Sequence, residues 1–168
     1  MTAARTDIEQ VERANTAFYE ALERGDFDEV AGLWLDADTD TEGTAADTDT
    51  DAGGTVSCVH PGWPVLRGRG EVLRSYALIM ANTEYIQFFL TDLKVGVAGD
   101  TALVTCTENI LSGGPPPEAG GELGPLVGQL VVATNVFRRT PDGWKLWSHH
   151  ASPVLAETDD EEGDKAPS

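Results

Sequence analysis

The first third of the chain places apolar residues at helical spacing. Steps of three and four residues over positions 7–23 separate the apolar side chains Ile8, Val11, Ala14, Phe18 and Leu22. Such a stripe is typical of an amphipathic helix that covers a core. Gly25 then suits a left-handed helix end, and Asp26 suits the cap of a second helix that reaches Trp34. The pattern therefore predicts two helices that meet at a tight bend.

The rest of the chain contains one further helical stripe and is otherwise strand-like. Residues 55–64 indicate a strand that ends at two prolines, and residues 68–82 carry a third helical stripe. From residue 85 onward, long β-branched and apolar runs break at the turns Gly99–Asp100 and Pro141–Gly143. Because three helices precede the long strands without β-α-β alternation, we predict an α+β fold. Its helices should cover one face of a mostly antiparallel sheet.

The predicted strands are apolar on both faces. One face meets the helices, so the other face also needs a cover. A second copy of the same chain is the simplest cover. This predicts a homodimer that forms through the outer face of the sheet.

The composition fits one domain with two acidic additions. The 168 residues, 40% of them hydrophobic, suffice for one core, which we place at residues 7–155. Acidic residues concentrate in an insert at 36–54 and in a tail at 156–168, which we expect to be solvated and flexible. Alternating aspartates in the insert could ligate calcium, but the glycine turn and distal glutamate of a calcium-binding loop are missing. A solubilising loop is therefore the preferred interpretation.

The charge and the apolar content restrict the partners. A net charge of -18 opposes binding to nucleic acid or to anionic membranes, since no basic stripe is present. The N-terminal segment lacks the apolar run of a signal peptide, and no window has the apolar length of a membrane span. These features predict a cytoplasmic protein. Cys58 and Cys106 lie in apolar segments, where we expect reduced core residues.

Three segments occur in an order that is typical of a known family. They are "FYEALERGDFDEVAGLW" with a Gly-Asp bend, "SCVHPGWPVLRGRGEVLRSY" with a His-Pro corner and a Gly-Arg helix start, and "VVATNVFRRTPDGWKLWSHHASP" with an Asp-Gly-Trp hairpin that ends in His-x-Ser. In this order the chain resembles the SnoaL-like branch of the nuclear transport factor 2-like superfamily. The likeness covers residues 8–154, apart from the acidic insert and a Gly/Pro-rich loop at 112–125.

What the resemblance implies is a cone-shaped α+β fold. In this fold a strongly curved sheet wraps the helices and leaves an apolar interior pocket, usually in a homodimer built sheet to sheet. The superfamily includes isomerases, dehydratases, polyketide cyclases, epoxide hydrolases and members that only bind. Because the fold alone does not distinguish these activities, the function has to be inferred from the residues of the pocket.

Two neighbouring histidines near the end of the last strand are separated by strand alternation. One face carries Trp144, Leu146, Ser148, His150 and Ser152. The other face carries Lys145, Trp147, His149 and Ala151. By similarity to the family, His150 would line the pocket and His149 would lie on the outer face near the dimer contact. This assignment assumes that no β-bulge interrupts the alternation.

His60, Glu108 and His150 are the candidate catalytic residues. His60 precedes Pro61 at a strand end, and an imidazole that titrates near neutrality can take a proton and return it. Glu108 shares a strand face with apolar residues, where a carboxylate is costly unless it is paired or protonated. Structural alternatives stay open, because either histidine can satisfy a buried hydrogen bond and Glu108 can reach solvent at a strand end.

Polar and aromatic side chains complete the predicted pocket. Asn135 interrupts an apolar strand, where it could donate to a substrate oxygen or make a cross-strand hydrogen bond. Aromatic residues at such spacing are often core residues, but four of them are also candidates for the walls around a planar hydrophobic ligand. These are Trp34, Trp63, Tyr76 and Phe88.

These residues predict a cofactor-independent lyase or isomerase of the dehydratase type, acting on a small hydrophobic carbonyl compound. His60 or His150 would be the base, Glu108 its partner or the acid, and Asn135 and Tyr76 would hold the oxygen. A metal site of His60, Glu108 and His150 lacks the expected ligand spacing, so no metal is predicted. A non-catalytic ligand-binding or assembly module stays an alternative, because no complete pattern of an epoxide hydrolase or a ketosteroid isomerase can be mapped. A polyketide cyclase is a further alternative.

Overall fold

Six strands form one curved, open sheet in the computed structural model, which describes residues 2–36, 55–114 and 125–155. The strand order is β2-β1-β6-β5-β4-β3, in which β1 pairs in parallel with β6 and every other pair is antiparallel. The strands are β1 (Ser57–Val59), β2 (Leu66–Arg67), β3 (Tyr85–Ala98), β4 (Thr101–Gly113), β5 (Val127–Thr140) and β6 (Gly143–Pro153). The predicted α+β class and the mostly antiparallel sheet are confirmed. The short strand β2 was not predicted.

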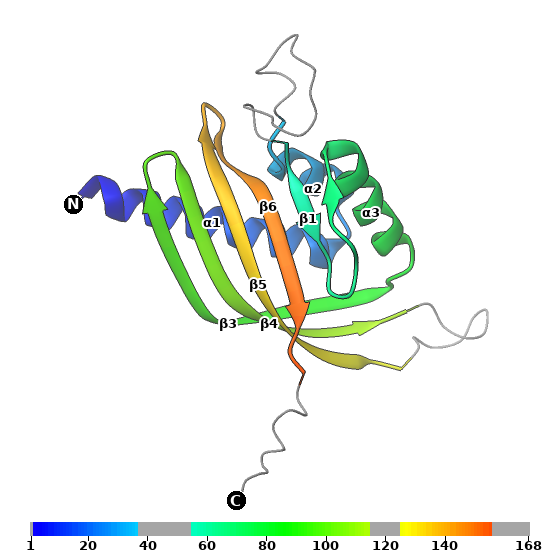
Figure 1. Ribbon diagram of the computed structural model, residues 1–168. Coiled ribbons are helices and arrows are strands. Elements are labelled where there is room, and N and C mark those ends of the chain that lie inside the picture. The colour runs from blue at the N-terminus through cyan, green and yellow to red at the C-terminus, as the bar shows by residue number, and fades with distance from the viewer. Residues whose placement is uncertain (1, 37–54, 115–124, 156–168) are drawn as a thin grey trace, which may run out of the picture.

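The three helices lie on the concave side of the sheet, as Figure 1 shows. They are α1 (Thr2–Arg24), α2 (Phe27–Leu33) and α3 (Arg69–Ala81). The long helix α1 crosses behind β3, β4 and β5, whereas α2 and α3 cover the end of the sheet that carries β1 and β2. The apolar stripe of α1 buries Val11 and Phe18 completely. This burial removes apolar surface from water and is the main reason why α1 docks on the sheet.

The predicted bend between the first two helices is confirmed. Gly25 has a φ of 67°, a left-handed conformation that glycine adopts without a steric penalty. The Asp26 carboxylate then accepts a hydrogen bond from the backbone N–H of Glu29 at 3.1 Å and caps α2. The bend turns the chain so that α2 and Trp34 reach the far side of the core.

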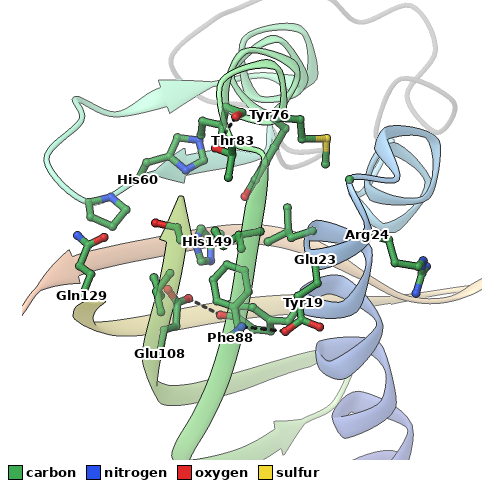
Figure 2. A pocket seen from close by; sticks show the side chains of 18 of the residues that line it. Tyr19, Glu23, Arg24, His60, Tyr76, Thr83, Phe88, Glu108, Gln129 and His149 are labelled. Atoms are coloured by element: carbon green, nitrogen blue, oxygen red, sulfur yellow. Dashed lines mark hydrogen bonds between the residues drawn. The ribbon is translucent and has the colours of Figure 1, made fainter. Parts of the chain in front are cut away.

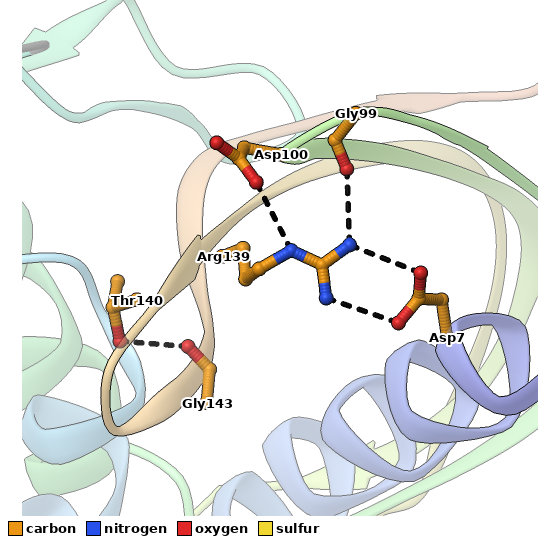
Figure 3. A network of polar contacts seen from close by, with 6 residues as sticks. All are labelled: Asp7, Gly99, Asp100, Arg139, Thr140 and Gly143. Atoms are coloured by element: carbon orange, nitrogen blue, oxygen red, sulfur yellow. Dashed lines mark hydrogen bonds and ion pairs between the residues drawn. The ribbon is translucent and has the colours of Figure 1, made fainter. Parts of the chain in front are cut away.

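Arg139 fastens the start of α1 to the end of the sheet (Figure 3). Two guanidinium nitrogens donate to the two carboxylate oxygens of Asp7 at 3.0 Å each, and Nε donates to Asp100 at 3.0 Å. A further hydrogen bond reaches the carbonyl oxygen of Gly99 at 3.1 Å. The hydrogen bonds from Arg139, and to a smaller extent its positive charge, hold the pKa of Asp7 below its ordinary value. We call this set of residues, Asp7, Gly99, Asp100 and Arg139, the arginine clamp.

The outer face of the sheet exposes apolar side chains. Phe89, Leu103, Leu130 and Val132 are each at least 43% exposed, and they lie on neighbouring strands β3, β4 and β5. The prediction that the strands are apolar on both faces is therefore confirmed. Cys58 and Cys106 are buried and unpaired, as expected.

Several sequence expectations lie outside the described residues. They concern the acidic insert from residue 37 to 54, most of the Gly/Pro-rich loop and the acidic tail from residue 156. Within the described residues, no helix has both the length and the apolar character that crossing a membrane requires.

Candidate functional site

A cavity of about 370 Å³ lies between the helices and the concave face of the sheet. Its wall combines the end of α1, one face of α3 and the inward side chains of β3, β4 and β6 (Figure 2). This volume is at the small end of the range for ligand pockets. Aromatic and aliphatic side chains make up about half of the wall, and polar or charged side chains, among them His60, Glu108 and His149, make up most of the rest.

Five of the predicted site residues line this cavity. They are His60, Trp63, Tyr76, Phe88 and Glu108. Trp34 does not line it, because its side chain is 1% exposed in the core between Phe18 and Tyr76. Asn135 is fully buried behind the cavity wall, where it contacts protein groups and not the cavity.

The prediction for the two neighbouring histidines is wrong. His149 is 5% exposed and lines the cavity, whereas His150 is exposed and lies on the outer face. The reason is a β-bulge between β5 and β6: Phe137 pairs with Leu146, but Val136 pairs with Ser148. One extra residue in β6 reverses the alternation for everything that follows. His150 therefore cannot act in this cavity.

The metal site considered from the sequence is not formed. Because His150 faces outward, it does not meet His60 and Glu108. Among the residues that the structure describes, no group of three or more His, Cys, Asp or Glu side chains has the arrangement of a metal site.

Glu108 is the buried carboxyl group among the described residues that line the cavity. Its side chain is 2% exposed, and its Oε2 accepts a hydrogen bond of 2.5 Å from the hydroxyl of Tyr19. Burial raises the pKa of Glu108 from 4.5 to about 7, while the hydrogen bond from Tyr19 acts in the opposite direction. A carboxyl group with this pKa exchanges protons readily at neutral pH, which is the property of a general acid or base.

His149 is held by Asn135 of the neighbouring strand. Its Nδ1 lies 2.5 Å from Oδ1 of Asn135, while Nδ2 of Asn135 donates to Asn15 at 2.9 Å and to Tyr19 at 3.1 Å. A carbonyl oxygen only accepts, so His149 carries its proton on Nδ1 in this arrangement. Burial, together with smaller contributions from the neighbouring His60 and His150, lowers the pKa of His149 to about 3. His149 is therefore neutral at neutral pH.

His60 carries its proton on the other ring nitrogen, Nε2, because of its contact with Ser75. Its Nε2 lies 2.8 Å from Oγ of Ser75, whose hydroxyl donates to the carbonyl of Val72 at 2.6 Å. Since that hydroxyl has a single proton, His60 donates through Nε2 and its Nδ1 is unprotonated. Burial lowers the pKa of His60 to about 4, so this histidine is neutral as well. The two imidazole rings lie 6.4 Å apart between their centroids.

Two thiols and two phenols near the cavity stay protonated at neutral pH. Burial raises the pKa of Cys58 to about 12 and of Cys106 to about 11, so neither thiol is a nucleophile at neutral pH. Burial also raises the pKa of Tyr19 and Tyr76 well above 10, which keeps both phenols available as donors. At the rim, the cation Arg24 is paired with Glu29 at 3.4 Å.

Sequence reasoning missed two residues of this site, Tyr19 and His149. Tyr19 follows Phe18 in the apolar stripe of α1, where it passes for a core aromatic residue. A signal was available: Asn15 and Tyr19 are four residues apart, so two polar groups lie together on a buried helix face. His149 was assigned to the wrong face because the bulge leaves no mark in the alternation.

A family model and one solved structure match almost the whole chain. The model, which describes a SnoaL-like domain, matches residues 11–157. The crystal structure of a candidate dehydratase of the NTF2-like family from Streptomyces avermitilis has 77% sequence identity and a TM-score of 0.82. It covers 91% of this chain and 99% of its own. These similarities confirm the family resemblance that was read from the three segments.

More distant solved structures share the fold. A candidate scytalone dehydratase from Novosphingobium aromaticivorans has 11% identity and a TM-score of 0.70, and covers 92% of this chain and 89% of its own. A candidate association domain of calcium/calmodulin-dependent protein kinase type II from Thiobacillus denitrificans has 25% identity and a TM-score of 0.61, and covers 86% and 94%. A comparison with curated proteins finds no match.

Proposed function

This chain belongs to the SnoaL-like family of the nuclear transport factor 2-like superfamily, and from that premise we propose that it is a lyase or isomerase of the dehydratase type. The observation that carries the proposal is Glu108, a buried carboxyl group in the cavity with a pKa of about 7. The substrate is a small hydrophobic carbonyl compound. The relative from Streptomyces avermitilis, itself a candidate dehydratase, supports this class of reaction.

Glu108 acts as the base and then as the acid. Its carboxylate takes a proton from the carbon next to the substrate carbonyl, and the electron pair of that C–H bond forms a C=C bond. The C–O bond to the β-hydroxyl group breaks, the proton passes from Glu108 to the departing oxygen, and water leaves. The carboxylate is regenerated, so atoms and charges balance without a further reactant.

The neutral groups of the cavity hold the substrate. Tyr76 lines the cavity as a protonated phenol and donates to the carbonyl oxygen, on which negative charge develops. Nε2 of His149 and Nδ1 of His60 are acceptors for substrate hydroxyl groups. Because both histidines have pKa values near or below 4, they orient the substrate as neutral hydrogen-bonding groups and leave proton abstraction to Glu108.

The wall favours an uncharged substrate. Trp63 and Phe88 supply apolar surface, and Glu23 and Glu84 lie at the rim. The lining cation, Arg24, is already paired with Glu29. A substrate that carries a carboxylate would lose hydration in this cavity without gaining a free cation.

Substitution of Glu108 tests the proposal. Small β-hydroxy ketones and aldehydes are screened first by thermal shift, since a ligand of the native state raises its melting temperature. Turnover of the compounds that bind is followed by the ultraviolet absorbance of the conjugated product. Glu108→Gln should lower kcat/KM by about 10³-fold, and the wild-type kcat/KM should rise with pH through about 7.

Matched variants separate a catalytic defect from a folding defect. Glu20→Gln makes the same change on the exposed side of α1 and should leave turnover unchanged. His149→Ala should weaken substrate binding, whereas His150→Ala on the outer face should not. Full turnover by Glu108→Gln would contradict the proposal. Ligands that bind to the wild type without any turnover would favour a binding module.

We also propose that the outer face of the sheet is the interface of a homodimer. The exposed apolar side chains of Phe89, Leu103, Leu130 and Val132 on three neighbouring strands support this, because exposed apolar surface of this kind is often covered in an oligomer. Light scattering should give twice the mass of one chain, and Leu103→Lys should give a folded monomer. A monomeric wild type would exclude the homodimer.

A further inference from the structure

The hydrogen bonds between Glu108 and His149 all run in one direction. His149 donates from Nδ1 to Oδ1 of Asn135, Asn135 donates from Nδ2 to Oη of Tyr19, and Tyr19 donates to Oε2 of Glu108. An ionised carboxylate can only accept, so it fixes the donor at each following step. The last consequence is that Nε2 of His149 is unprotonated while Glu108 is ionised.

The same chain of contacts runs in reverse when Glu108 carries a proton. The carboxylic acid then donates to Tyr19, and Tyr19 donates to Oδ1 of Asn135 once the amide has turned over. Asn135 presents Nδ2 to Nδ1 of His149, and the neutral imidazole then carries its proton on Nε2. The heavy atoms keep their places, because only the hydrogens and the two ends of an amide are exchanged.

Asn15 shows that the surrounding groups do not fix the direction of donation along these hydrogen bonds, because its own side chain lacks one partner among the described residues. It is completely buried, its Oδ1 accepts from Asn135, and its Nδ2 has no partner among the described residues. An unpaired buried donor costs free energy. In the reversed direction, the amide of Asn15 can also turn over and donate to Oδ1 of Asn135. The forward direction is therefore not held by surrounding contacts alone.

We propose that the protonation of Glu108 selects which ring nitrogen of His149 carries the proton, with Tyr19 and Asn135 as positioning residues between them. The cavity therefore has two states. With Glu108 ionised, His149 accepts a hydrogen bond from a ligand hydroxyl at Nε2. With Glu108 protonated, His149 donates from Nε2 to a ligand oxygen, which suits a hydroxyl group about to depart.

The groups around Glu108 leave it free to act as the switch. Six ionisable side chains interact electrostatically with it or share its cavity: Tyr19 of α1, Cys58 of β1, His60 beyond β1, Tyr76 of α3, Cys106 of β4 and His149 of β6. The rim of the cavity adds the charged residues Glu23 and Arg24 of α1 and Glu84 between α3 and β3. The six buried groups are neutral at neutral pH, since the phenols and thiols are protonated and both histidines are neutral. Glu108 is therefore the group in this set whose charge changes near pH 7.

Nitrogen-15 NMR of histidine-labelled protein tests the coupling without any substrate. The chain has three histidines, so three single variants assign the spectrum. The shift of a protonated ring nitrogen differs from that of a bare one, and His149 stays neutral over the range studied. On the alkaline side of the Glu108 pKa of about 7, most His149 should carry its proton on Nδ1, and on the acid side most should carry it on Nε2.

Variants of the connecting residues decide the outcome. Tyr19→Phe and Glu108→Gln should each abolish the pH dependence of the His149 tautomer, and Tyr85→Phe, which lies outside the cavity, should retain it. His60 should keep its proton on Nε2 throughout, because Ser75 holds it. A His149 tautomer that does not change with pH in the wild type, or that still changes in Glu108→Gln, would overturn the coupling. Since no turnover is measured, that result would leave the proposed lyase activity untouched.

Discussion

Helix α1 is joined to the sheet by two polar networks of opposite character. Near its start, Asp7 is part of the arginine clamp, in which Arg139 is 38% exposed and every charge has an opposite partner. Two and three turns further on, Asn15 and Tyr19 meet Asn135 and Glu108 at no more than 3% exposure, and no cation of the described residues is bonded to the carboxylate. The same helix thus carries an exposed network in which the charges are paired and a buried network in which the carboxylate has no cation among the described residues.

The two networks differ in their effect on the free energy of unfolding. Exposed ion pairs contribute little to the free energy of unfolding, because water and salt already solvate both charges. A buried carboxylate without a cation is unfavourable, and this is why the pKa of Glu108 rises to about 7. A protein gains nothing structurally from such a group, so its placement in a cavity points to chemistry.

The largest expected effect comes from breaking the buried network at its centre. Asn135→Leu leaves His149, Tyr19 and Asn15 without their shared partner at a site of zero exposure. Several buried groups lose hydrogen bonds together, so we expect a loss of about 4 kcal/mol in the free energy of unfolding. Urea denaturation followed by circular dichroism measures this loss.

Asn109→Leu is the matched control for that variant. Asn109 also bridges two strands through hydrogen bonds to Phe89 and Thr91, but it faces outward. The loss here should stay below about 1 kcal/mol, because Asn109 lies outside the core and its removal leaves no group of fully buried polar side chains without partners. Equal losses for the two variants would show that burial does not distinguish the two asparagines.

A somewhat smaller effect is expected in the pH dependence of stability. The pKa of Glu108 is about 7 in the folded chain and 4.5 when unfolded, so the folded state binds more protons between these values. The stabilisation is fully present below pH 4.5 and is lost as the pH rises through 7. The shift corresponds to about 3 kcal/mol.

Glu108→Gln removes this titration. The free energy of unfolding of the variant relative to the wild type should therefore increase by about 3 kcal/mol from acid to alkaline solution. Glu20→Gln should run parallel to the wild type at every pH. Parallel curves for Glu108→Gln as well would mean that the carboxyl group is solvated.

The features that the sequence could predict are the local ones. Helix α1, the Gly25 bend and the two hairpin turns follow from local periodicity and turn chemistry, and each was located within a few residues. Glu108 and His60 were found because a polar side chain in an apolar run is visible in the sequence. The family resemblance supplied the curvature that turns these elements into a cavity.

The features that the sequence did not predict depend on how the strands pair and how distant segments pack in the folded chain. The bulge opposite Val136 reverses the facing of His149 and His150, and nothing in the alternation of β6 reports an extra residue. Tyr19 was not singled out from the sequence, since its hydroxyl partner lies 89 positions away. Asn135 was expected either to touch the substrate or to make a cross-strand hydrogen bond, and the structure shows the second, because His149 of the neighbouring strand and Asn15 of α1 take its hydrogen bonds.

The smallest expected effect comes from removing the arginine clamp. Arg139→Ala deletes four hydrogen bonds, yet the melting temperature should fall by less than about 3 °C, since the freed carboxylates of Asp7 and Asp100 are solvated. The fall should be smaller still in concentrated salt, which screens the wild-type ion pairs. Arg139 also stacks on Trp144 at 4.5 Å, so Arg139→Gln, which keeps part of this packing, separates the two contributions. A large fall in both variants that salt does not reduce would make the exposed network as important to stability as the buried one.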